Sequence, residues 1–337
     1  MHLNRTEWMS GKTGLMIHYL PPGLYNQKGI RVADIDEAAD SFDISAFIKG
    51  LERAGAEWLI FTIGQNKGVY VSHNSVLEAA GARCTRRDLL LELAQAVKDS
   101  GRRFIAYLPA EVAINSTIRS AMGWEGGDYP YIPQDVFHDR YEGALREWAE
   151  RLGTLLDGWW LDGAWQVSKF TDEQWRTWGQ ALRAGNPAAA VALNTGAFCV
   201  NWLAPICDEV DYQAGECEVL TPEGLPYVGR EVRTLPLPPV NGKYEDGTTC
   251  LWHVLLPVDA LWMHTGSVPD FLPPSNAYSR NVIGGQLEMP IYSDAQLKKL
   301  REHYCGKGGA VSFNVATLAD GTMNPVTLEQ LHRVTKG

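Results

Sequence analysis

Short apolar runs alternate with amphipathic stretches along most of this chain of 337 residues. Runs with the length and composition of buried strands occur at 14–19, 58–64, 102–109, 158–164, 190–195, 250–258 and 310–315, with a weaker one at 208–216. Such short runs, bounded by glycine or polar residues, are typical of strands that are covered on both faces. The pattern therefore predicts up to eight buried strands.

Most of these runs are followed by a stretch in which apolar residues recur at the spacing of a helix. We predict helices at 43–56, 85–101, 140–156, 171–185, 293–309 and 327–334. The clearest helix covers 85–101, where Leu89 and Leu93 share one face. Thr85, with Asp88 three residues later, is the candidate residue to cap its first turn.

Alternating strands and helices imply βα units around a parallel sheet. Eight runs over this length favour an α/β fold of the (β/α)8 TIM-barrel type, regular or irregular, forming one catalytic domain over 1–337. A doubly wound sheet is the alternative, but no G-x-G-x-x-G motif follows the first run. Long loops are expected at 221–247 and 266–290, where a barrel would place them over its mouth.

Polar side chains gather where the apolar runs end. In a barrel of parallel strands these ends meet at one face, which carries the active site. The candidates are His18, Tyr19, Gln65, Asn66, Tyr107, Glu111, Asp162, Asn194, Asp211 and Glu216. Several also have a plainer structural interpretation, since a histidine can be satisfied within a core, amides can cap helices, and Asp211 can pair with an arginine.

Asp162 is the most unusual of these residues. It lies near the end of the apolar stretch LLDGWWLDGAW (155–165), although a buried carboxylate without partners costs several kcal/mol. Trp160 shares its face of the strand, and Gly163 lacks a Cβ and so allows a ligand to approach closely. We therefore expect Asp162 to stand in the wall of a pocket.

Composition narrows the class of partner. The chain has 12 tryptophans and 13 tyrosines, which suit stacking surfaces for sugars but also suit an aromatic core. A net charge of −10 without a run of lysine or arginine argues against binding nucleic acid. No apolar stretch reaches the length of a membrane span. From these two observations we expect neither nucleic acid nor a membrane as partner. Self-association is left open.

The first residues contain no apolar stretch of the secretory type, and the six cysteines form no C-x-x-C pair or metal-ligand spacing. We therefore expect a cytoplasmic protein with reduced thiols. Neither an HExxH motif nor a G-x-S-x-G motif is present, which disfavours metalloprotease and esterase chemistry. We expect no metal and no cofactor. Two carboxylates at one site are instead what glycoside hydrolysis requires.

Five motifs, in order, resemble the α-L-fucosidases of glycoside hydrolase family 29. They are KTGLMIHYLPPG (12–23), AGAEWLIFTIGQNKG (54–68), WWLDG (159–163), AGECEVLTPEG (214–224) and GGAVSFNVATLADGTMNP (308–325). The resemblance spans nearly the whole chain and implies a retaining exo-glycosidase that works by double displacement. It also implies a carbohydrate substrate and a TIM-type catalytic barrel.

The resemblance assigns roles to individual residues. Asp162 matches the nucleophile and Glu216 the acid/base, with Glu111 in reserve for the latter role. As the acid, Glu216 would be protonated near neutral pH, which requires a raised pKa. The residues expected to bind the substrate are His18, Tyr19, Gln65, Asn66, Tyr107, Glu111, Trp160, Asn194 and Trp262.

The chain also departs from the family pattern. Gln65 and Asn66 replace two histidines that bind fucose hydroxyls, Tyr19 replaces a tryptophan, and the C-terminal β-sandwich of the family is not expected here. The glycone therefore need not be fucose. Two other classes stay open. One is a non-catalytic carbohydrate-binding barrel, and the other is a different hydrolase or lyase acting on sugar acids, for which Lys67 and Arg230 are generic candidates.

Overall fold

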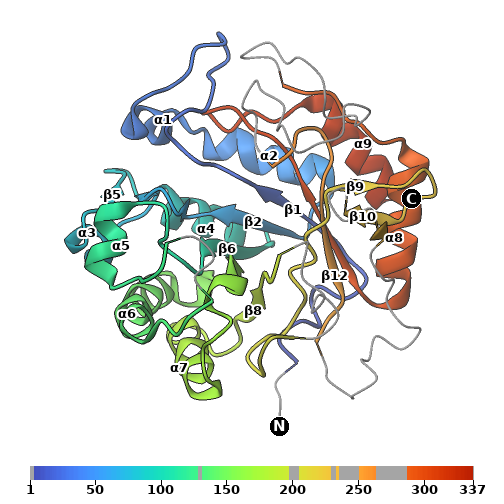
Figure 1. Cartoon of the computed structure of the whole chain (residues 1–337). Coiled ribbons are helices and arrows are strands. Elements are labelled where there is room, and N and C mark those ends of the chain that lie inside the picture. Colours follow the sequence, from blue (N-terminus) through green and yellow to red (C-terminus); the bar gives the residue numbers. More distant parts are fainter. Residues whose placement is uncertain are drawn as a thin grey trace.

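The computed structural model describes residues 4–127, 131–196, 205–228, 233–234, 250–262 and 287–336. Its centre is a curled sheet of seven parallel strands in the order β12-β13-β1-β2-β6-β7-β8 (Figure 1). The strands are β1 (Thr13–Ile17), β2 (Trp58–Thr62), β6 (Arg103–Pro109), β7 (Gly158–Asp162), β8 (Ala190–Leu193), β12 (His253–Pro257) and β13 (Ala310–Asn314). The predicted α/β architecture with a parallel sheet is confirmed, and the curled sheet is consistent with a TIM-like barrel.

The segment 211–217 lies between β8 and β12 without forming a regular strand. The backbone N–H of Asp211 donates to the Val191 carbonyl of β8. Isolated parallel bridges join Tyr212 to Leu251 and Glu216 to Leu255. Gly215 has a φ of +69°, and a Cβ there would lie 2.1 Å from the His253 carbonyl oxygen, so only glycine fits. The weak run predicted at 208–216 is therefore an irregular segment.

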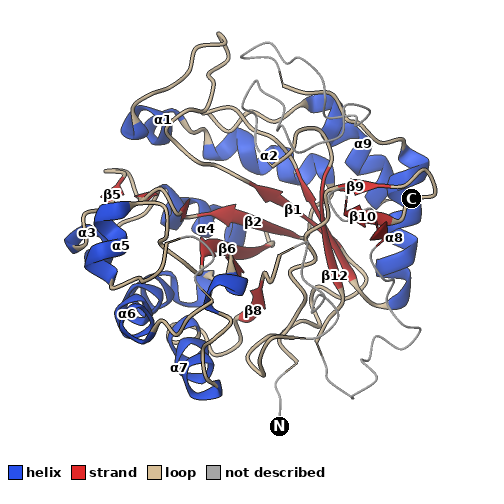
Figure 2. Ribbon diagram, viewed as in Figure 1, coloured by secondary structure: helices blue, strands red, loops and turns tan. Residues whose placement is uncertain are grey.

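Helices cover the outer face of the sheet (Figure 2). They are α1 (Ile35–Ser41), α2 (Ile44–Ala54), α3 (Ser75–Ala79), α4 (Leu89–Asp99), α5 (Ser116–Met122), α6 (Asp135–Leu152), α7 (Asp172–Leu182), α8 (Asp294–Tyr304) and α9 (Pro325–Thr335). The prediction that Thr85 caps the helix at 85–101 is wrong. Asp88 accepts a hydrogen bond from the Leu91 N–H and starts α4, whereas the Thr85 hydroxyl donates to the Arg87 carbonyl.

The described residues also form two small three-stranded sheets. One comprises β3 (Gly64–Gln65), β4 (Val69–Tyr70) and β5 (Arg83–Cys84), and the other comprises β9 (Val219–Leu220), β10 (Pro226–Val228) and β11 (Arg233–Thr234). The loops predicted at 221–247 and 266–290 fall largely outside the described residues, as does Arg230. Among the described residues, no helix is long and apolar enough to cross a membrane.

Buried apolar side chains, most of them large, fill the interior of the curled sheet. This cluster includes Met9, Met16, Trp58, Ile60, Ile105, Tyr107, Trp160, Ala192, Tyr212 and Leu255. Trp58, at the start of β2, donates to the Ser312 hydroxyl at 2.9 Å, and the ring of Trp8 packs edge-on against it. Among the described residues, the interior is therefore filled at the ends where the strands begin.

Candidate active site

A pocket of about 290 Å³ lies where the parallel strands end. It is lined by His18, Leu20, Gln65, Tyr107, Trp160, Asp162, Glu216, Leu255, Leu261 and Trp262. Most of the site residues predicted from the sequence are in this set. Within the described ranges, no group of three or more His, Cys, Asp or Glu side chains is placed to hold a metal ion.

Asp162, the last residue of β7, is surrounded by hydrogen-bond donors. The Tyr107 hydroxyl donates to its Oδ2 at 2.6 Å, and Gln65 Nε2 lies 3.4 Å from the same oxygen. The N–H of Gly163, the next residue, donates to Oδ1 at 2.9 Å. In each of these contacts a carboxylate oxygen of Asp162 is the acceptor.

One amide group joins the two candidate catalytic carboxylates. Asn194 Nδ2 donates to Asp162 Oδ1 at 2.8 Å and to Glu216 Oε2 at 2.7 Å. Both oxygens accept a hydrogen bond from the same nitrogen atom. The bond lengths of 2.8 Å and 2.7 Å therefore place Asp162 Oδ1 and Glu216 Oε2 at most 5.5 Å apart. Asn194 follows β8, whose last residue is Leu193, and its own N–H donates to the Leu161 carbonyl. Three neighbouring segments thus bring two acids to one point.

Tyr107 supports Asp162 from the side. Its ring stacks on Trp160 with the centroids 5.1 Å apart, and Gln65 Nε2 donates to its hydroxyl oxygen. Burial, reinforced by the nearby Asp162 charge, raises the pKa of Tyr107 well above its ordinary value. Tyr107 is therefore a neutral donor to Asp162.

His18 lines the pocket next to Tyr107. Its Nδ1 lies 2.7 Å from Asn314 Oδ1, and Asn314 Nδ2 donates to the Trp262 carbonyl at 2.7 Å. Its ring packs against Tyr107 and Trp262, with centroid distances of 5.3 Å and 5.6 Å. Burial lowers the pKa of His18, against the opposing effects of the Asn314 hydrogen bond and the Asp162 charge.

Asn66 and Glu111 form a pair beside the pocket. Asn66 Nδ2 donates to Glu111 Oε1 at 2.6 Å, and the Ala113 N–H donates to the other carboxylate oxygen. Glu111 is buried and is not among the residues that line the pocket. It lies against the Gly163 turn, where a Cβ would be 3.2 Å from Glu111 Cγ. The pair therefore packs against the turn that follows Asp162.

Two of the predicted strand-end residues lie elsewhere. Tyr19 is buried in the layer between sheet and helices, with its hydroxyl 2.8 Å from the Ala38 carbonyl and 2.7 Å from the Ala319 carbonyl. Neighbouring residues of an extended chain point to opposite faces, so His18 faces inward and Tyr19 outward.

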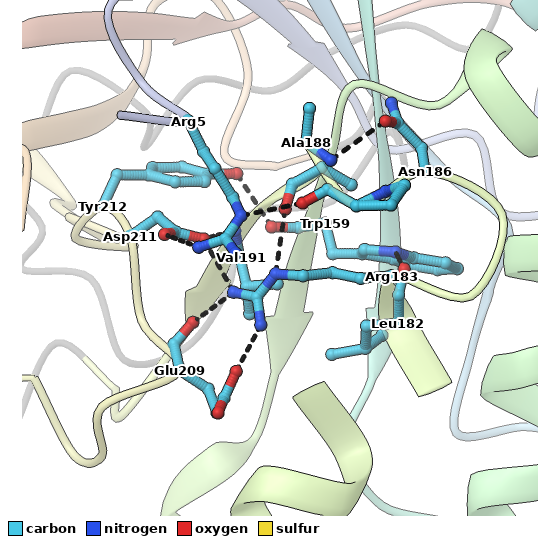
Figure 3. Close-up of polar contacts among 12 residues, drawn as sticks. Arg5, Trp159, Leu182, Arg183, Asn186, Ala188, Val191, Glu209, Asp211 and Tyr212 are labelled. Atoms are coloured by element: carbon cyan, nitrogen blue, oxygen red, sulfur yellow. Dashed lines mark hydrogen bonds and ion pairs between the residues drawn. The ribbon is translucent and has the colours of Figure 1, made fainter. Parts of the chain in front are cut away.

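Asp211 is paired with arginines, which is the plainer interpretation of its place in the sequence. It accepts from Arg5 at 3.1 Å and from Arg183 at 2.8 Å (Figure 3). It also accepts from the Val191 N–H near the start of β8, away from the end of that strand where Asn194 lies. Asp211 therefore belongs to the closed end of the sheet.

Four residues of the site were not predicted. Leu20, Leu255 and Leu261 line the pocket, and Asn314 orients His18. Asn314 ends β13, so the rule that selected the other strand ends would have found it. The three leucines carry no chemical signal, because leucine occurs throughout the core.

No known protein family matches the sequence, and no curated protein matches it either. Solved structures do match. An endo-fucoidan hydrolase of glycoside hydrolase family 107 matches with a TM-score of 0.66 and 15% identity over 98% of this chain and 53% of that chain. The chain thus spans about half the length of that protein. A second endo-fucoidan hydrolase of the same family matches with a TM-score of 0.61 and 16% identity, over 99% of this chain and 93% of that one.

α-L-Fucosidases also match. Isoenzyme 1 from Paenibacillus thiaminolyticus has a TM-score of 0.60 and 18% identity, over 98% of this chain and 74% of that one. An α-L-fucosidase of family 29 from Bacteroides thetaiotaomicron has a TM-score of 0.61 and 16% identity, over 100% of this chain and 73% of that one. At these identities the likeness concerns the fold, which is that of fucosidase-type glycoside hydrolases.

Proposed function

We propose that the protein is a retaining exo-glycosidase similar to the α-L-fucosidases, with Asp162 as nucleophile and Glu216 as acid/base. The observation that carries this proposal is the shared Asn194 amide, which limits the nearest oxygens of the two carboxylates to 5.5 Å apart. Retaining glycosidases keep their two carboxyl groups about 5–5.5 Å apart, whereas inverting enzymes need about 6.5–9.5 Å to admit a water molecule. The bound applies to one oxygen of each acid, and it is compatible with the shorter spacing that double displacement requires.

The proposed reaction has two steps. Asp162 attacks the anomeric carbon while Glu216 transfers its proton to the departing glycosidic oxygen, which leaves a covalent glycosyl ester on Asp162. Glu216, now ionised, takes a proton from a water molecule as that water attacks the same carbon, which releases the sugar and frees Asp162. Asn194, which donates to both acids, would hold their spacing through both steps.

The pocket favours a single terminal sugar. Its volume of about 290 Å³ lies near the lower end of the range for ligand pockets, which is about 300–1,000 Å³. Tyr107, Trp160 and Trp262 line the pocket, and Trp262 is the least buried of the three, so its ring suits the C–H face of a sugar. Gln65 is directed to Tyr107 and Asp162, and Asn66 to Glu111, so these amides are bound to protein groups. This difference from the fucosidase pattern supports a glycone other than fucose.

A panel of nitrophenyl α- and β-glycosides tests the function, with L-fucose, L- and D-galactose, L-rhamnose and L-arabinose as glycones. We expect hydrolysis of at least one member with retention at the anomeric carbon, followed by NMR of the first product. Asp162→Asn should lower kcat by about a thousandfold or more. The matched control is Asp172→Asn, an exposed residue in the first turn of α7, which should be fully active.

Chemical rescue separates the roles of the two acids. With an activated substrate, azide should restore turnover to Glu216→Ala and yield a glycosyl azide, because the small anion enters the space of the lost carboxylate. Full activity of Glu216→Ala without azide would remove it from the mechanism, and rescue of Glu111→Ala instead would transfer the role to Glu111. Sugar binding without turnover across the whole panel would favour the alternative function, a non-catalytic carbohydrate-binding barrel.

A further inference from the structure

A chain of directed hydrogen bonds fixes the proton on the His18 ring. The chain starts at the backbone carbonyl of Trp262, which can only accept. Asn314 must therefore turn its Nδ2 toward that carbonyl, at 2.7 Å. Its Oδ1, also an acceptor, then faces His18 Nδ1 at 2.7 Å. It follows that Nδ1 carries the hydrogen atom.

The other ring nitrogen is left as an acceptor. Burial lowers the pKa of His18, so the ring is neutral, and a neutral ring that carries its hydrogen on Nδ1 has a lone pair on Nε2. No described residue makes a hydrogen bond to Nε2, and His18 lines the pocket. Tyr107 and Trp262 pack against the ring and hold its orientation.

The groups facing His18 favour the same arrangement. Tyr107 on β6 is a neutral phenol, Asn314 on β13 is an uncharged amide, and Asp162 on β7 is the nearby carboxylate. A lone pair on Nε2 and the Asp162 carboxylate both attract a hydrogen-bond donor and both repel an anion. This wall of the pocket is therefore suited to a hydroxyl group.

We propose that Asn314 is a positioning residue that makes His18 a hydrogen-bond acceptor toward the glycone, so that the sugar must carry a free hydroxyl at that position. The inference rests on the glycosidase function proposed above, and it names a substrate class. An ether or a sulfate ester at that oxygen has no hydrogen to donate, and a sulfate also brings negative charge toward Asp162. The substrates are therefore glycosides without a substituent at that position.

Nitrogen NMR of the native protein, labelled with ¹⁵N-histidine, tests the arrangement without any substrate. The signals of His18 are assigned by their loss in His18→Gln. We expect a hydrogen on Nδ1 and none on Nε2. A hydrogen on Nε2 in the native protein at neutral pH would overturn the proposal, whether or not the protein hydrolyses any glycoside.

A charge-changing variant tests the part played by Asn314. In Asn314→Asp a negatively charged carboxylate replaces the amide group. Because this charge favours the protonated ring, we expect a second proton on His18, carried by Nε2. The control is Asn186→Asp, since Asn186 also donates to a backbone carbonyl, that of Leu156, at 2.8 Å, but lies at the closed end of the sheet (Figure 3). It should leave the His18 signals unchanged. Unchanged signals in folded Asn314→Asp would contradict the role of Asn314.

Substrate analogues test the consequence for specificity. For whichever glycoside is hydrolysed, deoxy, O-methyl and O-sulfo analogues are compared at each ring position. We expect one position at which all three changes lower kcat/KM by at least about 10-fold. At that position the O-sulfo analogue should lower kcat/KM by a smaller factor in Asn314→Asp than in the native protein. Equal acceptance of sulfate at every position would overturn the inference while leaving the hydrolase function intact, and failure of hydrolysis altogether would leave the NMR result to decide.

Discussion

Tyr107 is tied to Asp162 by a single hydroxyl group. It donates to Asp162 at 2.6 Å, while Gln65 occupies an acceptor site on the same oxygen. Tyr107→Phe removes this donor but keeps the ring that stacks on Trp160. Because a hydrogen bond to a charged group is worth about 1.5–3 kcal/mol, we expect kcat/KM to fall by about 10- to 100-fold with the fold retained.

The matched control for this variant is Tyr141→Phe. Tyr141 is a buried tyrosine of α6 whose hydroxyl donates to the Pro109 carbonyl at 2.6 Å. It should lose some stability in urea unfolding but keep its kcat/KM. Equal losses of kcat/KM in both variants would show that Tyr107 acts only through general packing.

The sequence locates the site residues better than it orients them. Asp162, Asn194 and Glu216 are visible because each is a polar residue close to the end of an apolar segment. His18 and Tyr19 cannot be told apart in this way, because both faces of the strand are covered and the alternation gives no contrast. The partners that orient the site, such as Asn314 for His18, are distant in sequence and become known only when the strands are assembled.

At the scale of elements, Asp259 ties the end of β12 to α9. It is buried, and its carboxylate accepts from the N–H groups of Ala260 at 2.8 Å and Ala316 at 3.0 Å and from the Thr327 hydroxyl at 3.0 Å. Burial raises the pKa of Asp259 from 3.8 to about 7, although these hydrogen bonds act in the opposite direction. The folded protein therefore keeps a proton that the unfolded chain has already released.

This difference makes stability depend on pH. Because the folded state binds more protons, the contribution of Asp259 is greatest below pH 3.8 and is lost as the pH rises through about 7. Asp259→Asn resembles the protonated form, since its amide can accept from Ala316 and donate to Thr327. We expect its melting temperature to match that of the native protein near pH 4 and to exceed it by several degrees at pH 8. A constant difference between the two proteins across this range would contradict the assignment.

The elements themselves are largely predictable. Seven of the runs became strands of the main sheet, because strands covered on both faces need continuous apolar sequence. The segment 211–217 departs from this pattern because Gly215 takes a left-handed conformation against β12. The short helices α1, α3 and α5 are not evident in the sequence, since five to seven residues are too few to show a clear period.

At the scale of the whole molecule, Arg183 joins segments from different parts of the chain. It pairs with Glu209 and Asp211, and Asp211 also pairs with Arg5 (Figure 3). Arg183→Ala leaves two mostly buried carboxylates short of a partner, so we expect a loss of about 2–4 kcal/mol in the free energy of unfolding. Urea denaturation measures it, with Arg176→Ala as control because Arg176 pairs with Glu173 at the surface. If both variants lose equally little, the network contributes no more than a surface ion pair.

These long-range pairs could not be derived from the sequence. Arg5 and Asp211 are separated by 206 positions, and nothing in the local pattern around either residue identifies its partner. The sequence allows the interpretation that Asp211 pairs with an arginine. Which arginines it pairs with depends on how distant segments pack in the folded protein.

The filled interior of the sheet also determines how ligands enter and leave the site. Among the described residues, Trp58 and Trp8 fill the interior at the ends where the strands begin, so a ligand enters and leaves the pocket on the side where the strands end. For a glycoside, the inner ring is then trapped behind the aglycone until the latter has gone. Under the proposed mechanism the monosaccharide leaves last, so we expect it to inhibit by competing with substrate for the pocket.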